Sequence, residues 1–516
     1  MAMAELTVTN PLTRELLYSV ASAGEAETDA AFDAARKASD RLRDTTVRQR
    51  LNAIRTLVHW LQTEREWLLD RIVAETGRCR TDAMISDLFQ LTEDCEWLLR
   101  HARKVLGDEK VSTPVTLLGK HSRVIHAPHG VVLVISPWNL PLAIGMTAAM
   151  FAFAAGNAVI LKPSEHTPMA DVLERIRALH PLLHEALQVV HGDGAVGAAL
   201  VDRRPDHIVF TGSLKTGRAL LAQAAPLMIP VTLELGSRDM MLVFDDADRE
   251  RAVNAAAWGN LHNSGQSCTA VERILVQRDG YESFVGELRQ RLESARTGVG
   301  TDAELGVPTT DFQMHHIEEL VDEARRAGAQ VHLGGRRSDC GRFYVPTLLT
   351  DVPDGARILA EEIFGPVVVV DSFATEEEAV KQHNRRDCGL STSVFTRDRQ
   401  RARRLERRLE TGSLNINNVM LTEGNPGLPF GGVKYSGYGR MKGVEGLLGM
   451  TASRAVLSDF SRAPAEPNWH PYSAAKLGLL GRLLDAVTRR GPGKWLRLIR
   501  VGLAVAGQLR RDRPNR

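Results

Sequence analysis

The sequence predicts an α/β protein with a parallel sheet followed by a second α/β region, and three observations support this prediction. With 516 residues, the chain is too long for one compact core and favours two or three domains. Its 43% hydrophobic and 25% charged residues are typical of a soluble globular protein. From about Val131, short apolar runs alternate with helix-length segments. This alternation is typical of parallel sheets that helices cover on both faces.

The expected elements follow this pattern in chain order. The first hundred residues predict amphipathic helices, because apolar side chains recur every three or four positions, at Leu51, Ile54, Leu57, Leu61, Leu68 and Ile72. Residues 113–130 are compatible with a β-hairpin. Strands of a first sheet are expected at residues 131–135, 158–162, 187–190, 207–210 and 231–235, with helices at 142–155 and 216–225. Strands of a second α/β region are expected at residues 273–276, 344–349, 367–370, 393–396 and 413–416.

Cysteine usage and targeting signals bound the class of protein. Five cysteines without a CxxC pair argue against a disulfide framework or a zinc site, and no metal is expected. The start of the chain lacks a basic stretch followed by an apolar run, and no window reaches about 18 uninterrupted apolar residues. We therefore expect a reduced, cytoplasmic protein. The net charge of +2 gives no indication of nucleic-acid binding.

Three short segments carry side chains suited to catalysis. Cys268 follows the small-residue stretch SGQS (264–267), which lets a backbone approach a ligand closely. A thiolate is a strong nucleophile, although a lone cysteine is more often a small buried hydrophobic residue. Asn139 directly follows the expected strand 131–135, where an amide can donate to an oxyanion or serve a turn. Glu234 ends an apolar strand, where burial suits a general base and a structural glutamate equally.

With these segments in view, the chain resembles the aldehyde dehydrogenase superfamily from about residue 8 to 458. Eight motifs occur in the family's order: PWNLP (137–141), AAGNAVILKPSEHTP (154–168), FTGSLKTG (210–217), LELG (233–236), GQSC (265–268), GRFYVPTLL (341–349), EEIFGPV (361–367) and PFGGVKYSGYGR (429–440). The resemblance implies an NAD(P)-dependent, non-acylating enzyme that oxidises an aldehyde to a carboxylic acid. In this assignment Cys268 attacks the carbonyl, Asn139 holds the oxyanion, and Glu234 activates the water that hydrolyses the thioester.

The resemblance also implies a dinucleotide site. Trp138 and Ser213 would contact the pyrophosphate, which suits a helix N-terminus. Lys162 and Glu165 would hold the adenosine ribose, and Glu165 favours NAD because its carboxylate would repel a 2′-phosphate; NADP is the alternative. Glu362 and Phe364 would contact the nicotinamide riboside. The predicted cofactor site also includes Ser164, Gly212, Gly217, Leu235 and Gly236.

The chain departs from the family pattern at two places. Ser237 and Arg238 stand where a second Gly and a Lys are usual, which bears on the flexibility of the Glu234 loop. Cys388 stands where an aromatic residue is common and is expected to contribute packing only.

Several alternatives for function stay open. The side chains expected to line the substrate tunnel are Leu140, Leu142, Met146, Ser267 and Thr269. They favour an apolar aliphatic or aromatic aldehyde, with a semialdehyde such as succinate semialdehyde as the alternative. A cysteine hydrolase or thioesterase could instead use Cys268, with His262. A catalytically weak, membrane-tethered binding protein is the other reading.

The family pattern also predicts the domain organisation. Residues 1–108 and 128–236 would form the NAD(P)-binding domain, which contains a doubly wound sheet. Residues 237–432 would form the α/β catalytic domain. A bridging element, 109–127 with 433–461, would support a homodimer or homotetramer. Residues 462–516 form a basic extension, with 12 Lys and Arg against three Asp and Glu, so the extension carries +9 and the rest of the chain −7.

Within the extension, residues 477–490 and 494–511 predict two basic amphipathic helices. Through residues 476–511 they could lie peripherally at the inner membrane face, or they could pack against protein.

Overall fold

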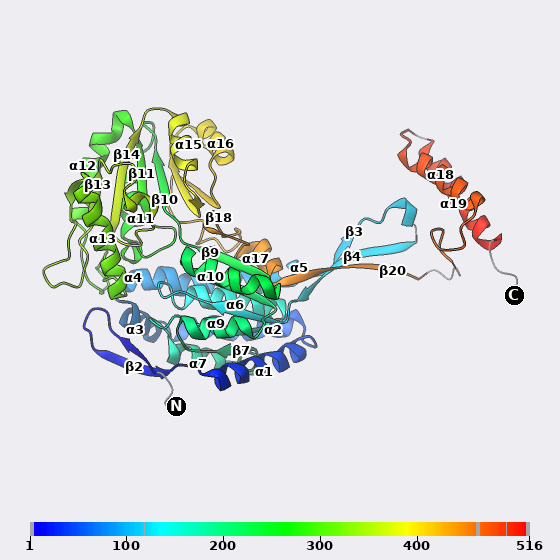
Figure 1. Ribbon diagram of the computed structural model, residues 1–516, viewed down its shortest axis with the longest axis horizontal. Helices are drawn as coiled ribbons and strands as arrows, with labels where there is room; N and C mark the ends of the chain where they lie inside the picture. Colours follow the sequence, from blue (N-terminus) through cyan, green and yellow to red (C-terminus); the bar gives the residue numbers. More distant parts are fainter. Residues whose placement is uncertain (1–4, 118, 461–464, 492, 512–516) are drawn as a thin grey trace. The chain divides into compact units, whose positions relative to one another are not determined.

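The computed structural model describes residues 5–117, 119–460, 465–491 and 493–511. The chain divides into two compact units (Figure 1). The larger unit comprises Met1–Gly107 and His126–Ala452, and the smaller unit comprises Asp108–Ile125 and Ser453–Arg516.

A six-stranded sheet in the larger unit has the order β19-β9-β8-β5-β6-β7. Its parallel strands are β5 (Val131–Ile135), β6 (Ala158–Lys162), β7 (Leu187–Val189), β8 (His207–Gly212) and β9 (Val231–Leu235). At one edge, β19 (Gly437–Tyr438) pairs antiparallel with β9. The chain winds outward from β5 in both directions, which confirms the predicted doubly wound sheet.

Helices cover this sheet. The helix α6 (Ala143–Ala155) packs against β5 and β6 and is almost entirely buried, because its residues are apolar on every side. The helix α10 (Leu214–Ala224) packs against β8 and β9. Three further helices follow the strands: α7 (Ala170–Ala178), α8 (Pro181–Ala186) and α9 (Gly194–Asp202).

The predicted helical start is confirmed. Its helices are α1 (Glu25–Leu42), α2 (Val47–Thr63), α3 (Arg65–Thr76), α4 (Arg80–Ala83) and α5 (Gln90–Val105), with a π-helical turn at Met84–Phe89. The apolar positions that carried the prediction are buried. Two antiparallel strands precede these helices, β1 (Glu5–Thr9) and β2 (Leu16–Ala21). These two strands were not predicted.

A seven-stranded sheet forms the other part of the larger unit, in the order β12-β13-β14-β11-β10-β16-β17. The strands are β10 (Asp239–Val243), β11 (Val271–Gln277), β12 (Gln330–Leu333), β13 (Thr347–Thr350), β14 (Val367–Phe373), β16 (Ser391–Phe395) and β17 (Ser413–Ile416). All pair in parallel except β12 with β13. The central strand β10 was missed, although its buried run DMMLV is the signal of a strand covered on both faces.

The remaining helices of the larger unit accompany this sheet, except the helix Gly443–Gly449, which packs against α5 and α6. The helices are α11 (Arg249–Leu261), α12 (Tyr281–Glu293), α13 (Asp311–Ala327), α14 (Arg357–Ala360), α15 (Glu376–Asn384), α16 (Arg399–Arg408) and α17 (Gly443–Gly449). The short strands β15 (Cys388–Gly389) and β18 (Val433–Lys434) pair with each other.

The smaller unit contains a three-stranded sheet and two helices. The sheet has the order β20-β4-β3, with β3 (Glu109–Val111), β4 (Lys120–Pro128) and β20 (Thr451–Asp459). The hairpin is present, but its first strand precedes residue 113, because Pro114 has no N–H to donate and a helical turn follows at Val115–Leu117. Both predicted tail helices form, as α18 (Ala474–Thr488) and α19 (Lys494–Arg511). Among the described residues, none of the helices combines the length and apolarity needed to cross a bilayer.

One predicted boundary differs from the compact units. Residues 433–452, which the family pattern assigns to the bridging element, belong to the larger unit, where β19 extends the six-stranded sheet. The reason is tertiary pairing of a two-residue strand, which carries no local sequence pattern. The assignment of domains to functions stays a prediction.

Candidate active site

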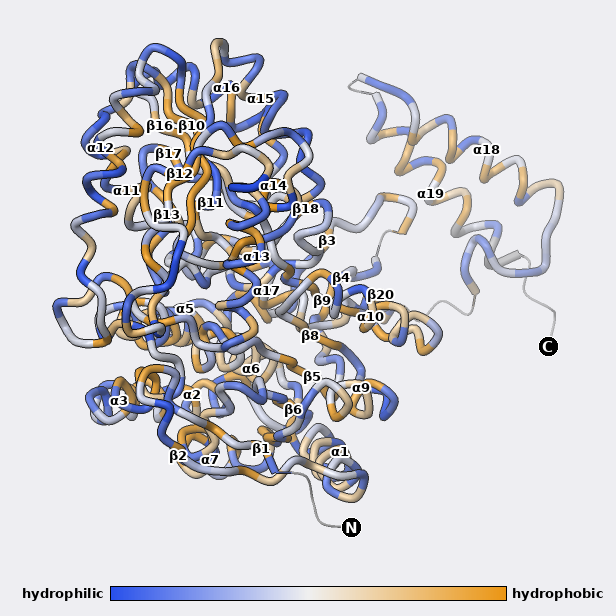
Figure 2. Tube along the Cα trace, turned by 60° about the vertical axis from the view of Figure 1, so that its left-hand side comes forward, coloured by the Kyte–Doolittle hydropathy of each residue, from blue (hydrophilic) through white to orange (hydrophobic). Residues whose placement is uncertain are grey.

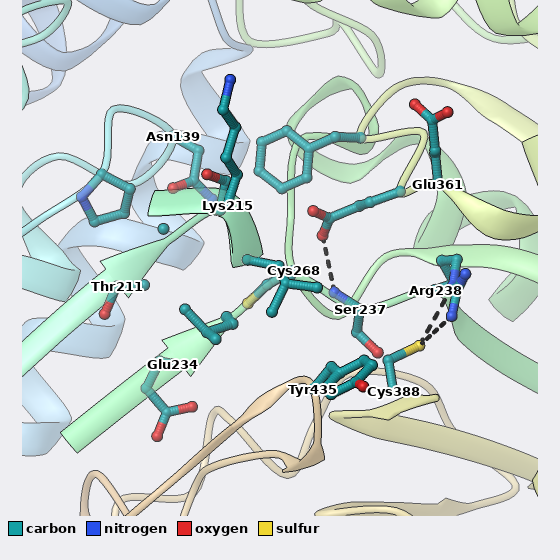
Figure 3. A pocket seen from close by; sticks show the side chains of 18 of the residues that line it. Asn139, Thr211, Lys215, Glu234, Ser237, Arg238, Cys268, Glu361, Cys388 and Tyr435 are labelled. Atoms are coloured by element: carbon teal, nitrogen blue, oxygen red, sulfur yellow. Dashed lines mark hydrogen bonds between the residues drawn. The ribbon is translucent and has the colours of Figure 1, made fainter. Parts of the chain in front are cut away.

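A cavity of about 1150 Å³ lies at the carboxyl ends of β8 and β9 (Figure 3). The ends of these strands contribute Thr211, Gly212, Glu234 and Leu235 to its wall. The loop after β5 contributes Trp138 and Asn139, and Cys268 comes from the turn before β11. Glu362 and Phe364 come from the segment before β14. The cavity therefore gathers side chains from both sheets of the larger unit.

Cys268 lies near the centre of this site, with Asn139 on one side and Glu234 on another (Figure 3). The turn that presents it depends on Gly265, whose φ is +72° and whose Cβ would collide with the Gly365 carbonyl. Burial raises the pKa of the Cys268 thiol well above its usual value, and the carboxylates of Glu423 and Glu362 raise it further. The thiol is therefore protonated at neutral pH and needs a base before it can attack.

The Asn139 amide is held in a buried hydrogen-bond network. Its Nδ2 donates to the Gln266 carbonyl at 3.0 Å, so Asn139 and the Cys268 turn are joined directly. The Asn139 carbonyl accepts from Asn263 Nδ2 at 3.1 Å and from the guanidinium of Arg78. This network orients an amide donor beside the thiol, which is the arrangement that oxyanion stabilisation requires.

The Glu234 carboxyl is buried at the end of β9. Burial raises its pKa well above the usual value, and the nearby Arg440 opposes that rise. Neither carboxyl oxygen has a hydrogen-bond partner among the described residues. The group faces Gly431, where a Cβ would lie 2.8 Å from Oε1, and Figure 3 shows it pointing away from Cys268. A side-chain rotation would be needed to turn this carboxylate toward the thiol.

Several predicted cofactor residues line the same cavity: Trp138, Gly212, Ser213, Leu235, Gly236, Glu362 and Phe364. Ser213 caps α10 by accepting from Thr216 N at 3.2 Å. Glu362 Oε1 accepts from Ser237 N at 3.1 Å, and a Cβ on Gly236 would overlap its other oxygen. The helix N-terminus suits a phosphate and the Glu362 carboxylate suits ribose hydroxyls, so this wall fits a dinucleotide.

Four predicted cofactor residues are not on the cavity wall: Lys162, Ser164, Glu165 and Gly217. Lys162 ends β6, where its Nζ lies 3.6 Å from Glu165. The Ser164 hydroxyl accepts from His166 N at 3.3 Å. Gly217 allows α10 to approach β9, because a Cβ there would lie 2.6 Å from Leu235 Cδ2.

The predicted tunnel residues do not line this cavity, and their role stays a prediction. Leu142 and Met146 are fully buried in the core around α6, and Leu140 is almost so. None of the three lines the cavity, and Ser267 and Thr269 are also off its wall. Met146 packs inward because α6 is apolar all round.

Two residues that the sequence did not predict lie close to Asn139 and Cys268. Arg78 is fully buried and pairs with the equally buried Asp87 at 2.8 Å, while its guanidinium also donates to the Asn139 carbonyl. Glu423 accepts a hydrogen bond from Thr269 Oγ1 at 3.0 Å, next to Cys268. Neither position carries a local signal, since each acts through contacts with distant residues.

Two cations on α10 were also missed. Lys215 and Arg218 stand on the cavity wall, and the Arg218 guanidinium lies over the Tyr435 ring at 4.6 Å. Both residues lie in FTGSLKTGR, in the first turns of the helix that follows β8. This position could have predicted that they face a ligand at the end of the strand.

The two departures from the family pattern meet in space. The Arg238 guanidinium donates to Cys388 Sγ at 3.3 and 3.4 Å and pairs with Asp387 (Figure 3). Cys388 lines the cavity, so its expected role in packing alone is incomplete.

The side chain of His262 is held by two other residues. Its ring nitrogens lie 2.6 Å from the Ser86 hydroxyl and 2.9 Å from the Asp82 carboxylate. Neither ring nitrogen is therefore paired with Cys268, as the hydrolase alternative would require.

Comparison with known proteins identifies the family. The sequence model of the Aldehyde dehydrogenase family matches residues 2–456. A 4,4'-diapolycopene aldehyde oxidase from Methylomonas sp is 37% identical over 475 residues, covering 92% of this chain and 89% of that protein. A succinate-semialdehyde dehydrogenase [NADP(+)] from Escherichia coli is 33% identical over 441 residues, covering 84% and 90%.

A crystal structure supports the same assignment. A betaine aldehyde dehydrogenase point mutant from Staphylococcus aureus, in complex with NAD+ and with a BME-modified cysteine, superposes with a TM-score of 0.84 at 30% identity. The match covers 91% of this chain and 96% of that one. Because the family match spans both sheets and every residue of the cavity wall, the chain belongs to the aldehyde dehydrogenase family and oxidises aldehydes with NAD(P)+.

Proposed function

We propose that Cys268 is the nucleophile of this oxidation. The thiol of Cys268 first gives up its proton to a water molecule. The resulting thiolate adds to the aldehyde carbon, and the Asn139 amide donates to the resulting oxyanion. When bound, NAD(P)+ supplies the hydride acceptor. Loss of hydride leaves a thioester on Cys268, and Glu234 takes a proton from the water that hydrolyses it. The observation that carries this proposal is the placing of the thiol, the amide and an unpartnered buried carboxyl on one cavity.

The roles of the cofactor residues are part of the same proposal. Ser213 and Trp138 hold the pyrophosphate, and Lys162 with Glu165 binds the adenosine ribose. Glu362 and Phe364 hold the nicotinamide riboside, with Ser164, Gly212, Gly217, Leu235 and Gly236 shaping the backbone around it. NAD is favoured, because the carboxylate of Glu165 would repel a 2′-phosphate.

An apolar aliphatic or aromatic aldehyde is the proposed substrate. The Glu423 carboxyl beside Thr269 disfavours a second carboxylate near Cys268, which counts against succinate semialdehyde. The name of the Methylomonas relative, a diapolycopene aldehyde oxidase, supports a long apolar substrate.

The test is NAD(P)H formation by the wild type and by Cys268→Ala across a panel of aldehydes. We expect turnover with apolar aldehydes in the wild type and none in the variant. Thermal unfolding of the variant checks that the fold is intact. Turnover that survives in Cys268→Ala would remove this residue from its role, and a preference for succinate semialdehyde would overturn the substrate assignment.

We also propose the assembly and location of the enzyme. Residues 1–108 and 128–236 serve as the NAD(P)-binding domain and 237–432 as the catalytic domain. Residues 109–127 and 433–461 support a homodimer or homotetramer in the cytoplasm. The helices of residues 476–511 give it a peripheral position at the inner membrane face. Size-exclusion chromatography with light scattering measures the number of subunits, and a monomer would contradict the assembly.

A further inference from the structure

The two tail helices use only part of their surface to pack on each other. Leu479 and Ala486 of α18 and Leu498 of α19 are buried, and Leu480 and Val505 line a small gap between the helices. Ser473 caps α18 by accepting from Lys476 N at 3.1 Å. The hairpin therefore has its own apolar seam, made by one face of each helix.

A second apolar face of each helix remains exposed. We call it the exposed apolar face, and its side chains are 59% to 72% accessible: Leu477, Leu484, Trp495, Leu496, Ile499 and Leu503. On α19, Trp495, Ile499 and Leu503 recur every four residues and so form one stripe. Figure 2 shows apolar stretches along both helices. Leaving such a face in water is costly, since each large apolar side chain favours burial by about 1.5–3 kcal/mol.

Basic side chains border this face. Residues 474–503 carry the exposed cations Arg482, Arg489, Arg490, Arg497 and Arg500 and the partly exposed Lys494, against the single acid Asp485. Among the described residues, none of these cations forms an ion pair with a carboxylate. Arg500 lies one turn after Leu496, at the border of the exposed apolar face. Its long side chain can therefore extend away from that face toward solvent or headgroups.

We infer that the exposed apolar face of α18 and α19 enters the interfacial layer of an anionic bilayer, with these cations on the lipid phosphates. A second copy of the hairpin would cover the apolar face but bring two sets of six cations together, whereas anionic headgroups neutralise them. Exposed aromatic rings at Trp469, Tyr472 and Trp495 suit the boundary between headgroups and acyl chains. This inference deepens the proposed peripheral location and does not depend on the catalytic roles.

Flotation of the full-length protein tests the inference. The vesicles are pure phosphatidylcholine or phosphatidylcholine with phosphatidylglycerol, at low and high salt. We expect binding to the anionic vesicles, weakened by salt, and little binding to the neutral ones. The triple variant Trp495→Ser, Ile499→Ser, Leu503→Ser should bind at least about tenfold more weakly. Arg497→Glu with Arg500→Glu should lose the preference for anionic lipid.

Matched controls separate the outcomes. Met228→Ser removes an exposed apolar side chain of the larger unit, and Arg48→Glu with Arg289→Glu reverses two exposed cations there; both should bind as the wild type does. Failure of the wild type to float, or equal flotation of the triple variant, would overturn the inference. If the wild type does not bind vesicles and the triple variant loses the oligomers that the wild type forms, the exposed apolar face binds a second copy of the chain. Turnover of a water-soluble aldehyde, measured on the same samples, shows separately whether the proposed catalysis holds.

Discussion

Cys268 and Glu234 both have a pKa that burial raises, so both lose reactivity as pH falls. The reactive forms are the thiolate and the carboxylate, and the pKa of each is raised above its usual value. We therefore expect kcat/KM for the aldehyde to rise with pH through the neutral range and to level off only above it. Stopped-flow measurement of NAD(P)H formation across pH tests this. A rate that is flat or that falls with increasing pH would contradict the assignment.

Removing the carboxylate of Glu234 should separate the two halves of the reaction. In Glu234→Gln the Cys268 thiol can still lose its proton to water and attack, but thioester hydrolysis lacks its base. We expect a burst of NAD(P)H formation followed by steady turnover slower by about 10²–10⁴. The same carboxyl-to-amide change at the exposed Glu406 of α16 should leave both phases unchanged. Complete loss of the burst would mean that Glu234 acts before hydride transfer.

Gly236 allows two segments to approach at the cofactor wall. A methyl group on this residue would overlap the Glu362 carboxylate, which accepts from Ser237 N. Overpacking of this kind typically costs about 1–3 kcal/mol, so Gly236→Ala should raise the KM for NAD+ at least about fivefold. Gly194→Ala is the matched control, since no atom lies within 4 Å of the Cβ it would add. An unchanged KM would show that Glu362 does not hold the cofactor.

Among the elements, the segment that joins α3 to α4 positions the loop after β5. Arg78 pairs with Asp87 in the dry interior, and its guanidinium donates to the Asn139 carbonyl. Replacing Arg78 with Met leaves an uncompensated buried carboxylate, so we expect a loss of about 3–5 kcal/mol in the free energy of unfolding. Urea denaturation measures it. Adding Asp87→Asn should restore part of the stability, because it removes the second charge and keeps an acceptor for the N–H groups of Leu142 and Ala143.

If Arg78 only stabilised the fold, the double variant would also recover kcat. We expect instead that kcat stays low in the double variant, since the Asn139 loop has lost the donor that orients it. Recovery of kcat together with stability would contradict the positioning role.

Within the whole molecule, every residue that lines the catalytic cavity falls between Pro137 and Tyr435, inside the larger unit. The tail helices belong to the smaller unit. We therefore expect an enzyme that ends at Phe460 to oxidise a water-soluble aldehyde at a rate within about twofold of the full chain. A steady-state assay of the two proteins tests this. Loss of turnover in the shortened enzyme would show that the tail supports the active site itself.

Local patterns predicted a large part of this molecule. Continuous apolar runs predicted the strands of the six-stranded sheet, because a strand buried on both faces needs an apolar side chain at every position. The central strand β10 was missed although it carries the same pattern, and the two-residue strands β15, β18 and β19 carry too little pattern to detect. Short motifs placed Cys268, Asn139 and Glu234 at strand ends because backbone turns restrict the residues that fit there.

The sequence by itself determined the family and its reaction, because eight motifs in one order reflect constraints that act within a few residues of each other. Only the tertiary structure decided which side chains share a site. It brought Arg78 to Asn139 across 61 positions, Ser86 to His262 across 176 and Thr269 to Glu423 across 154. It also buried Leu142 and Met146 in the core around α6. Such contacts depend on how elements pack, and side-chain order along the chain does not encode packing locally.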